Sequence, residues 1–250
     1  MKIIISPAKK MKINTDILAV RNLPRFLNQT EQLLQYLKNL SYEEAKTLWN
    51  CNDSIATLNY ERIQHMELKE NLTPALLSYE GIQYQYMAPN VMAFDQWDYV
   101  QEHLYILSGF YGLVRPLDGV VPYRLEMQAK VQMPGIKNLY EYWGHALYDE
   151  VAAETDIILN LASKEYSKCI EKYLIDDIRL ITCVFGEYKN DKIIEKGTYA
   201  KMARGEMVRF MAENKIDNLE NLKEFNRLGF GYSEDFSEEN TLTFVKENKR

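Results

Sequence analysis

The stretch 107–127, LSGFYGLVRPLDGVVPYRLEM, combines residues that shape a backbone with residues that bind anions. Its glycines allow tight turns or close backbone approach, and its two prolines fix φ and keep the preceding residues extended. Arg115 and Arg124 are therefore carried on stiff chain, with Tyr123 and Glu126 beside them. Guanidinium groups held in this way suit carboxylates or phosphates. The alternative is a proline-rich turn whose arginines pair with surface carboxylates.

A second candidate is SPAKK at 6–10, which directly follows the strand predicted at Lys2–Ile5. Functional loops in open α/β sheets commonly lie at the carboxyl ends of strands. Ser6, Lys9 and Lys10 are thus well placed to meet an anion. Because the segment has no glycines it is not a P-loop, and a strand end with solvated lysines remains the alternative.

A third candidate is NLASKEYSK at 160–168. Ser163 is expected to cap a helix that begins at Lys164, so that the free amides of the first helical turn form an anion site. Asn160 and Tyr166 flank this turn. Glu165 could equally complement the helix dipole without any ligand.

The segment 199–211 is predicted to be a helix on which Lys201, Arg204 and Arg209 share a broad basic flank. An ordinary solvated helix face is the alternative. Gly205 in mid-helix disfavours the helix by roughly 1 kcal/mol relative to alanine, which indicates close packing at that point.

Composition limits the classes of function. The formal net charge of −6 does not draw the protein toward nucleic acid, so DNA binding would need a local basic surface. We expect a cytoplasmic protein that does not enter the membrane, because the chain has no apolar run of bilayer length and no secretory signal. Widely spaced cysteines and isolated histidines predict neither a disulfide framework nor a metal site, and no cofactor is expected.

Hydrophobic patterning predicts an α/β to α+β fold with a mixed sheet flanked by helices. No linker or repeat divides the chain, so we expect a single domain over 1–250. Strands are predicted at 2–5, 156–162, 178–188, 192–195 and 241–247. Helices are predicted at 24–39, from the capping box at Ser41, and at 53–69, 95–108, 139–153 and 199–213.

Five ordered blocks together resemble the YaaA family of bacterial peroxide-stress proteins. They are Ile5–Lys9, 107–127, Leu139–Gly144, Asn160–Tyr166 and Ala203–Gly205, and the resemblance runs from residue 3 nearly to the end. The resemblance implies a cytoplasmic protein that protects against hydrogen peroxide. It would do so by limiting unincorporated intracellular iron, which in turn limits damage to DNA and proteins.

Members of this family also look like DNA-binding proteins with an unusual mixed fold, a positively charged cleft and a helix-hairpin-helix-like element. In this sequence the best candidate for that element is the predicted helix 95–108 with the turn Gly109–Gly112 and the segment after it. Its two glycines are three residues apart, whereas a standard hairpin of that type has them two apart.

The first hypothesis is therefore a protein that binds plain, bent or bulged duplex DNA through phosphate contacts, independently of base sequence. Backbone amides at 109–112 and 163–165 would assist the basic side chains. The candidate binding residues are Ser6, Lys9, Lys10, Gly109, Gly112, Arg115, Tyr123, Arg124, Asn160, Ser163, Lys164, Tyr166, Lys201, Arg204 and Arg209.

The second hypothesis is an enzyme that acts on a small anionic substrate in a polar pocket. Glu126 or Glu165 would be the general base, Lys9 or Lys201 the electrophilic or Schiff-base amine, and Arg124 the substrate anchor. One enclosed pocket would favour this enzyme, whereas an open basic groove as wide as a duplex would favour DNA. A third hypothesis, iron sequestration by the carboxylates Glu126, Glu141 and Asp149, has no recognisable ligand spacing.

Overall fold

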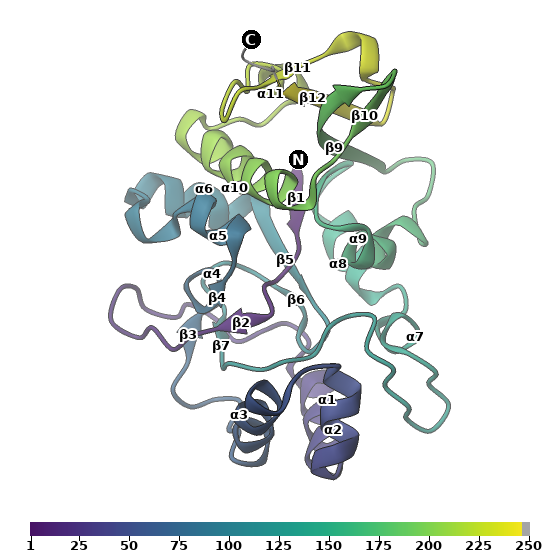
Figure 1. Cartoon of the computed structure of the whole chain (residues 1–250). Helices are drawn as coiled ribbons and strands as arrows, with labels where there is room; N and C mark the ends of the chain where they lie inside the picture. Colours follow the sequence, from purple (N-terminus) through teal and green to yellow (C-terminus); the bar gives the residue numbers. More distant parts are fainter. Residues whose placement is uncertain (247–250) are drawn as a thin grey trace.

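The fold is built on a mixed sheet. Five parallel strands form the centre of this sheet, and antiparallel strands extend it. The computed structural model describes residues 1–246, and the strand order is β11-β12-β9-β8-β1-β5-β6, with β10 attached to β9 (Figure 1). The parallel strands are β1 (Lys2–Ile5), β5 (Leu104–Ser108), β8 (Ile157–Leu161), β9 (Arg179–Lys189) and β12 (Thr241–Lys246). The antiparallel additions are β6 (Gly112–Val114), β10 (Lys192–Ile194) and β11 (Phe230–Tyr232).

The direction in which the chain winds reverses between β1 and β8. From β1 the chain reaches β5 on one side, and it then passes to β8 on the other side of β1 before continuing to β9. In open parallel sheets, the carboxyl ends of strands at such a reversal form a crevice, and ligands commonly bind there.

Helices of very different lengths surround the sheet (Figure 1). The long helix α10 packs against α5 and α6, while α8 and α9 contact each other. The helices are α1 (Leu27–Lys38), α2 (Tyr42–Trp49), α3 (Asp53–Gln64), α4 (Ala75–Ser78), α5 (Ile82–Met87), α6 (Phe94–His103), α7 (Leu139–Trp143), α8 (Ala146–Ala152), α9 (Lys164–Glu171), α10 (Gly197–Asn214) and α11 (Leu219–Leu222).

Short elements complete the fold. Two-residue strands pair as β2 (Lys10–Met11) with β4 (Tyr79–Glu80), and as β3 (Thr73–Pro74) with β7 (Gly119–Val120). Single turns of 3-10 helix are η1 (Pro89–Val91) and η2 (Glu234–Phe236). None of the helices within residues 1–246 combines the length and the apolar character that a membrane crossing requires.

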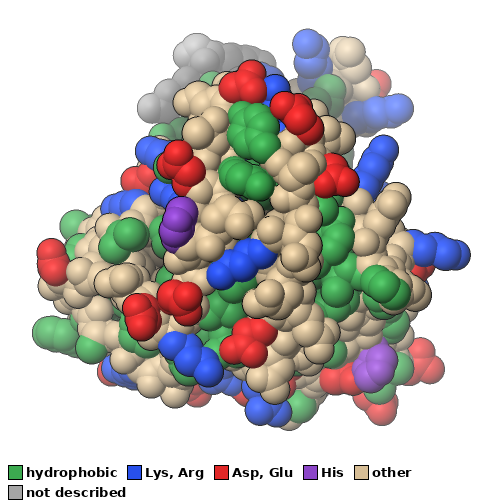
Figure 2. All heavy atoms as spheres, turned by 90° about the horizontal axis from the view of Figure 1, so that it is seen from below, with side chains coloured by type: hydrophobic (Ala, Val, Ile, Leu, Met, Phe, Trp, Pro, Cys, Tyr) green, Lys and Arg blue, Asp and Glu red, His purple; other side chains and the backbone are tan. Residues whose placement is uncertain are grey.

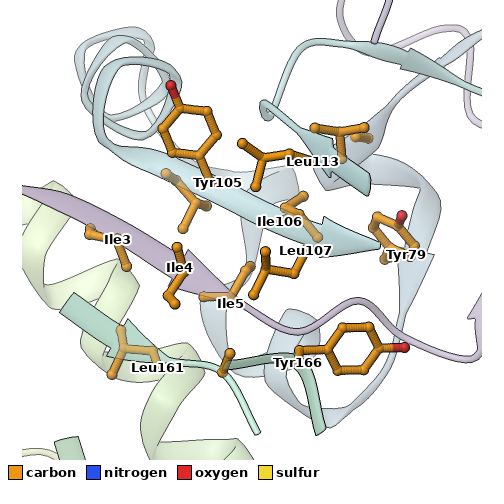
Figure 3. Packing of buried hydrophobic residues seen from close by; sticks show 14 of the residues in the cluster. Ile3, Ile4, Ile5, Tyr79, Tyr105, Ile106, Leu107, Leu113, Leu161 and Tyr166 are labelled. Carbon is orange, nitrogen blue, oxygen red and sulfur yellow. The ribbon is translucent and has the colours of Figure 1, made fainter. Parts of the chain in front are cut away.

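One continuous hydrophobic core joins these elements into a single domain. The side chains of Ile3, Ile4 and Ile5 are fully buried, because β1 lies between β5 and β8 and helices cover the sheet. Figure 3 shows these isoleucines packed beside Ile106, whereas Tyr79 lies beyond the carboxyl end of β5. The first polar side chains at this edge are Ser6, directly after β1, and the buried Ser108 at the end of β5.

Most sequence-predicted elements are confirmed, with boundary shifts. Strands at 2–5, 156–162, 178–188, 192–195 and 241–247 are present as β1, β8, β9, β10 and β12, and the last predicted position, 247, lies outside the described residues. The capping box at Ser41 is also present: the Glu44 amide donates to Ser41 Oγ, and Glu44 Oε2 accepts from the Ser41 amide at 2.8 Å. The first predicted helix begins later, at Leu27, and the third ends earlier, at Gln64.

Two predicted helices are wrong in part. Helix α6 ends at His103, and 104–108 is strand β5, which turns back as β6. The proposed helix-hairpin-helix element is thus a helix followed by a β-hairpin, because the apolar run LYILS is fully buried beside β1. The predicted helix 139–153 is divided at Gly144, whose φ of +51° lies in the left-handed region.

Candidate functional site

A pocket of about 390 Å³ lies at the carboxyl ends of β1 and β8, where the winding of the sheet reverses. We call it the β1–β8 pocket. Its walls come from segments that are far apart in the sequence but meet at this edge of the sheet. The lining residues are Ser6, Pro7, Ala8, Lys9, Lys10, Glu80, Gly81, Ile82, Gln83, Tyr84, Tyr123, Arg124, Leu125, Glu126, Ser163, Glu165, Tyr166, Lys201 and Arg204.

Hydrogen bonds between the two strand ends hold the floor of the pocket. The Ser163 amide donates to Ser6 Oγ at 2.8 Å, and the two hydroxyl oxygens lie 3.2 Å apart. Asn160, buried in β8, accepts a bond from the Ala162 amide at 2.9 Å and so shapes the turn before Ser163. Ser163 is the residue before α9, as predicted, but its side chain makes no capping bond.

A carboxylate held by two cations forms one wall. Glu126 Oε2 lies 2.6 Å from Lys9 Nζ, and Glu126 Oε1 accepts a bond from Arg124 Nη2 at 3.1 Å. Burial differs strongly among the three side chains, since Arg124 is 10% exposed, Glu126 16% and Lys9 65%. The Arg124 Nε atom is buried and has no hydrogen-bond partner within residues 1–246.

Helix α10 supplies another part of the wall through Lys201 and Arg204. The Arg204 side chain is 14% exposed, its Nη2 lies 3.4 Å from Glu195 Oε1, and its buried Nε likewise finds no partner in the described chain. Gly205 lets this helix approach α5, because a Cβ at this position would lie 2.1 Å from the Gln83 carbonyl oxygen. The close packing that the sequence predicted at Gly205 is therefore confirmed.

Glu165 brings a second carboxylate to the pocket. Its Oε1 accepts a hydrogen bond from the Gln128 amide at 3.2 Å. Burial raises the pKa of Glu165 above its usual value, and the negative charge of Glu126 adds to this, against the opposing effects of the Gln128 amide and Lys9. A carboxyl group with a raised pKa is suited to proton transfer.

Buried tyrosines form the apolar back of the pocket. Tyr123 OH lies 2.6 Å from Ser108 Oγ and 2.9 Å from Tyr79 OH. Burial raises the pKa of Tyr123 to about 12, and it also raises the pKa of Tyr84 and Tyr166, so these phenols are neutral at physiological pH. In Figure 3 the Tyr166 ring extends away from the isoleucines of β1.

Many of the residues predicted from the sequence converge on this pocket. Because their segments are not neighbours in the sequence, only the fold could bring them together. The predicted residues that line it are Ser6, Lys9, Lys10, Tyr123, Arg124, Glu126, Ser163, Glu165, Tyr166, Lys201 and Arg204.

Other predicted residues lie elsewhere. Arg115 lines a separate hollow, where it pairs with Glu154 and donates to Tyr105 OH at 2.6 Å. For Arg115, the alternative that it pairs with a carboxylate is therefore confirmed. Arg209 pairs with Glu213 on its own helix at 2.8 Å. Lys164 is exposed at the start of α9 but does not line the pocket.

The predicted backbone donors at 109–112 are also not part of the pocket. The amides of Phe110 and Tyr111 donate to Ser108 Oγ at 3.2 and 2.9 Å. Gly109 and Gly112 have a packing role instead: a Cβ at Gly109 would lie 2.5 Å from the Leu125 carbonyl oxygen, and Gly112 has a φ of +73°.

Sequence reasoning missed the wall formed by 80–84. Tyr84 OH donates to the Ser6 carbonyl at 2.9 Å, and Gln83 Nε2 donates to the Leu161 carbonyl at 3.4 Å, so this segment is tied to both strand ends. Gly81 was the available signal, since a Cβ there would lie only 3.0 Å from Ala8 Cβ.

The three carboxylates considered for iron do not come together. Glu126 contacts Lys9 and Arg124, Glu141 accepts from the Lys137 amide, and Asp149 pairs with His145. Over residues 1–246, no group of three or more histidine, cysteine, aspartate or glutamate side chains is arranged to hold a metal ion.

Sequence comparisons agree with the resemblance noted above. The family described as "Peroxide stress protein YaaA" matches residues 1–236. A UPF0246 protein of Lachnoclostridium phytofermentans is 65% identical over 98% of this chain and 96% of its own length. UPF0246 proteins of Desulfitobacterium hafniense and Pediococcus pentosaceus are 58% and 50% identical, each over 98% of both chains. The chain therefore belongs to the YaaA family of peroxide stress proteins.

Proposed function

We propose that this peroxide stress protein binds a small anionic ligand in the β1–β8 pocket and acts on it as an enzyme. The observation that carries the proposal is the pair of buried Nε atoms of Arg124 and Arg204, which have no partner among residues 1–246. A buried donor left unpaired is unfavourable by about 1–3 kcal/mol, and by more when it is charged. Both arginines line the pocket, and an oxyanion bound there is the kind of ligand that guanidinium donors pair with.

The position of the pocket supports the same proposal. It lies at the carboxyl ends of adjacent parallel strands at a reversal of winding, where open α/β sheets commonly bind ligands. Its volume of about 390 Å³ suits a small molecule and is too small for a duplex.

We assign proton transfer to Glu165 and anchoring to the two arginines. A carboxyl group with a raised pKa is closer to the pH at which it must both accept and donate a proton. Glu126, which contacts Lys9 and Arg124, would position those cations. Lys201 and Lys9 remain the amine candidates, because both line the pocket.

The binding proposal is tested by calorimetric titration of the protein with inorganic phosphate and with sulfate. Arg204→Met should weaken binding by about tenfold or more, because a hydrogen bond to a charged group contributes about 1.5–3 kcal/mol. Arg209→Met is the matched control, since it removes an arginine five residues further along α10 that pairs with Glu213. Equal affinities of the two variants, or no binding by the wild type, would contradict the proposal.

DNA binding is a second candidate, which the exposed lysines at the pocket mouth favour. Lys9 and Lys10 are 65% and 79% exposed, and Lys201 is exposed beside them. DNA phosphates could contact these side chains without entering the pocket. On the face that Figure 2 shows, by contrast, basic and acidic side chains are interspersed.

Fluorescence anisotropy with plain and bulged duplexes across a salt series tests this candidate. A Lys10→Ala/Lys201→Ala variant should reduce the salt slope by about 0.9 for each DNA phosphate that a lysine no longer neutralises. Lys223→Ala, just after α11 and not among the residues that line the pocket, should leave the slope unchanged. If the double variant and the control have the same slope as the wild type, the lysines at the mouth do not bind DNA.

We propose that the limitation of unincorporated iron, which the family resemblance implies, is indirect. The carboxylates suggested for iron have other partners, as described above. The test is to load the purified protein anaerobically with ferrous iron and then desalt it. Stoichiometric iron retained after desalting would contradict an indirect role.

A further inference from the structure

A second hollow adjoins the β1–β8 pocket across Lys9 and Glu126, which line both. It is a groove of about 990 Å³ between α2 and the segment 126–132, and we call it the α2 groove. The ion pair between Lys9 Nζ and Glu126 Oε2, at 2.6 Å, marks the boundary between the two hollows. Cavities that hold small molecules have volumes of about 300–1,000 Å³, so each hollow can hold part of a ligand.

The α2 groove differs from the pocket in its chemistry. Hydrogen-bonding side chains without charge contribute much of its lining, namely Tyr36, Thr47, Asn50, Gln128 and Gln132. Such amides and hydroxyls both donate and accept hydrogen bonds, which suits an uncharged polar molecule.

The charges of the groove disfavour a second anion there. Its lining carries the ammonium groups of Lys9 and Lys130 against the carboxylates of Glu43, Glu44 and Glu126. In the α2 groove, carboxylates thus outnumber ammonium groups. Arg124 and Arg204, in contrast, both line the β1–β8 pocket. One anionic group would therefore bind in the pocket and a neutral group in the groove.

Trp49, which lines the α2 groove, carries a buried donor without a partner among the described residues, and this independently points to a ligand. Trp49, the last residue of α2, is only 3% exposed, and its indole Nε1 has no hydrogen-bond partner among residues 1–246. Buried N–H groups without a partner are rare in folded proteins. A carbonyl, hydroxyl or ring nitrogen of a ligand in the groove would accept this bond.

We infer that the ligand is a phosphomonoester with an uncharged, hydrogen-bonding body of about nucleoside size. Its phosphate binds Arg124 and Arg204 in the pocket, and its body lies in the α2 groove, where Trp49 Nε1 donates to it. This inference rests on the proposed function of the pocket. A sugar phosphate and a nucleotide share this chemistry, and they differ in how much of the groove they fill.

Calorimetry of the full chain with inorganic phosphate, ribose 5-phosphate and the common 5′-ribonucleoside monophosphates tests the inference. At least one phosphomonoester should bind about tenfold or more tightly than inorganic phosphate. Ribose 5-phosphate as the tightest ligand would identify the body as a sugar, and a nucleotide would identify it as a nucleoside. Trp49→Phe should weaken that ester by about three- to tenfold, the effect of one neutral hydrogen bond, and leave phosphate unaffected.

A variant that fills the groove provides the sharper test. Thr47 is exposed on α2 and lines the groove, so Thr47→Trp should abolish the advantage of the ester while phosphate still binds. Thr57→Trp is the matched control, because Thr57 is an exposed threonine on α3 outside the groove. If no ester binds more tightly than phosphate, or if the two variants behave alike, the inference is wrong although the pocket binds anions. If phosphate does not bind either, the proposed function fails with it.

Discussion

The backbone amide of Ser163 donates a hydrogen bond of 2.8 Å to Ser6 Oγ, which joins loops 157 residues apart in the sequence. One loop follows β1 and the other follows β8, and these neighbouring strands lie on the two sides of the reversal in winding. The bond therefore fixes the distance between the strand ends on which the anion pocket is built.

Ser6→Ala removes this bond without adding bulk. We expect the free energy of unfolding to fall by about 1 kcal/mol, the usual contribution of one hydrogen bond. Sulfate affinity should fall as well, because the two strand ends are no longer held together. Urea unfolding and calorimetry measure the two effects. Ser54→Ala, at an exposed position of α3, is the control, and equal results for both variants would mean that the bond is unimportant.

Gly205→Ala tests the approach of α10 to α5. The added Cβ would lie 2.1 Å from the Gln83 carbonyl oxygen, so the helix must move away from the wall formed by 80–84. We expect a loss of about 1–3 kcal/mol in the free energy of unfolding, typical of overpacking, and weaker sulfate binding. Gly197→Ala, at the first residue of the same helix, has no atom within 4 Å of the added Cβ and should be neutral or slightly stabilising. Equal stability of the two variants would contradict the close contact.

Asp118 predicts a pH dependence of stability. Burial raises its pKa from 3.8 to about 6, against the opposing effects of the Arg115 amide and charge. Between those two values the folded state binds more protons than the unfolded state, so stability decreases as the pH rises. Asp118→Asn lacks this effect but keeps an acceptor for the Arg115 amide, 2.8 Å away.

The stability of Asp118→Asn relative to the wild type should therefore increase from about pH 4 to pH 6. The pKa change corresponds to at most about 3 kcal/mol. Urea unfolding of both proteins at several pH values gives the difference directly. A difference that does not vary over this range would show that Asp118 is not desolvated in the folded protein.

Glu165 predicts a pH dependence of anion binding. Its pKa is raised, chiefly by burial, so its carboxyl becomes neutral on acidification before a solvent-exposed carboxyl would. Loss of that negative charge should strengthen sulfate binding as the pH falls below neutral. Sulfate is the appropriate probe because it does not titrate in this range. Lys9 and Glu126 are the charged neighbours of Glu165 and are unchanged in the variant that follows.

Glu165→Gln should bind sulfate at neutral pH about as tightly as the wild type does at low pH, with a weaker dependence on pH. Calorimetry at matched ionic strength measures both proteins. Parallel pH profiles for the two proteins would assign the titration to another group of the pocket.

Local patterning was enough to predict much of the fold. The unbroken apolar run of β1 and the Ser41 capping box are properties of a few adjacent residues, and both are confirmed. The run 104–108 was misassigned to a helix, because an apolar segment of that length suits a buried helix or a buried strand equally. Pairing with β1 decides between them, and that pairing spans about a hundred residues.

The sequence by itself determined which groups the site could use: hydroxyls after strand ends, arginines on stiff or helical chain, and acidic residues near them. Tertiary structure alone decided which of them meet. Arg124 enters the pocket whereas Arg115 pairs with Glu154, and Arg204 faces the pocket whereas Arg209 pairs with Glu213. The physical reason is that convergence depends on strand order and on how closely helices pack. These are set by contacts between distant residues, which no local pattern of side chains records.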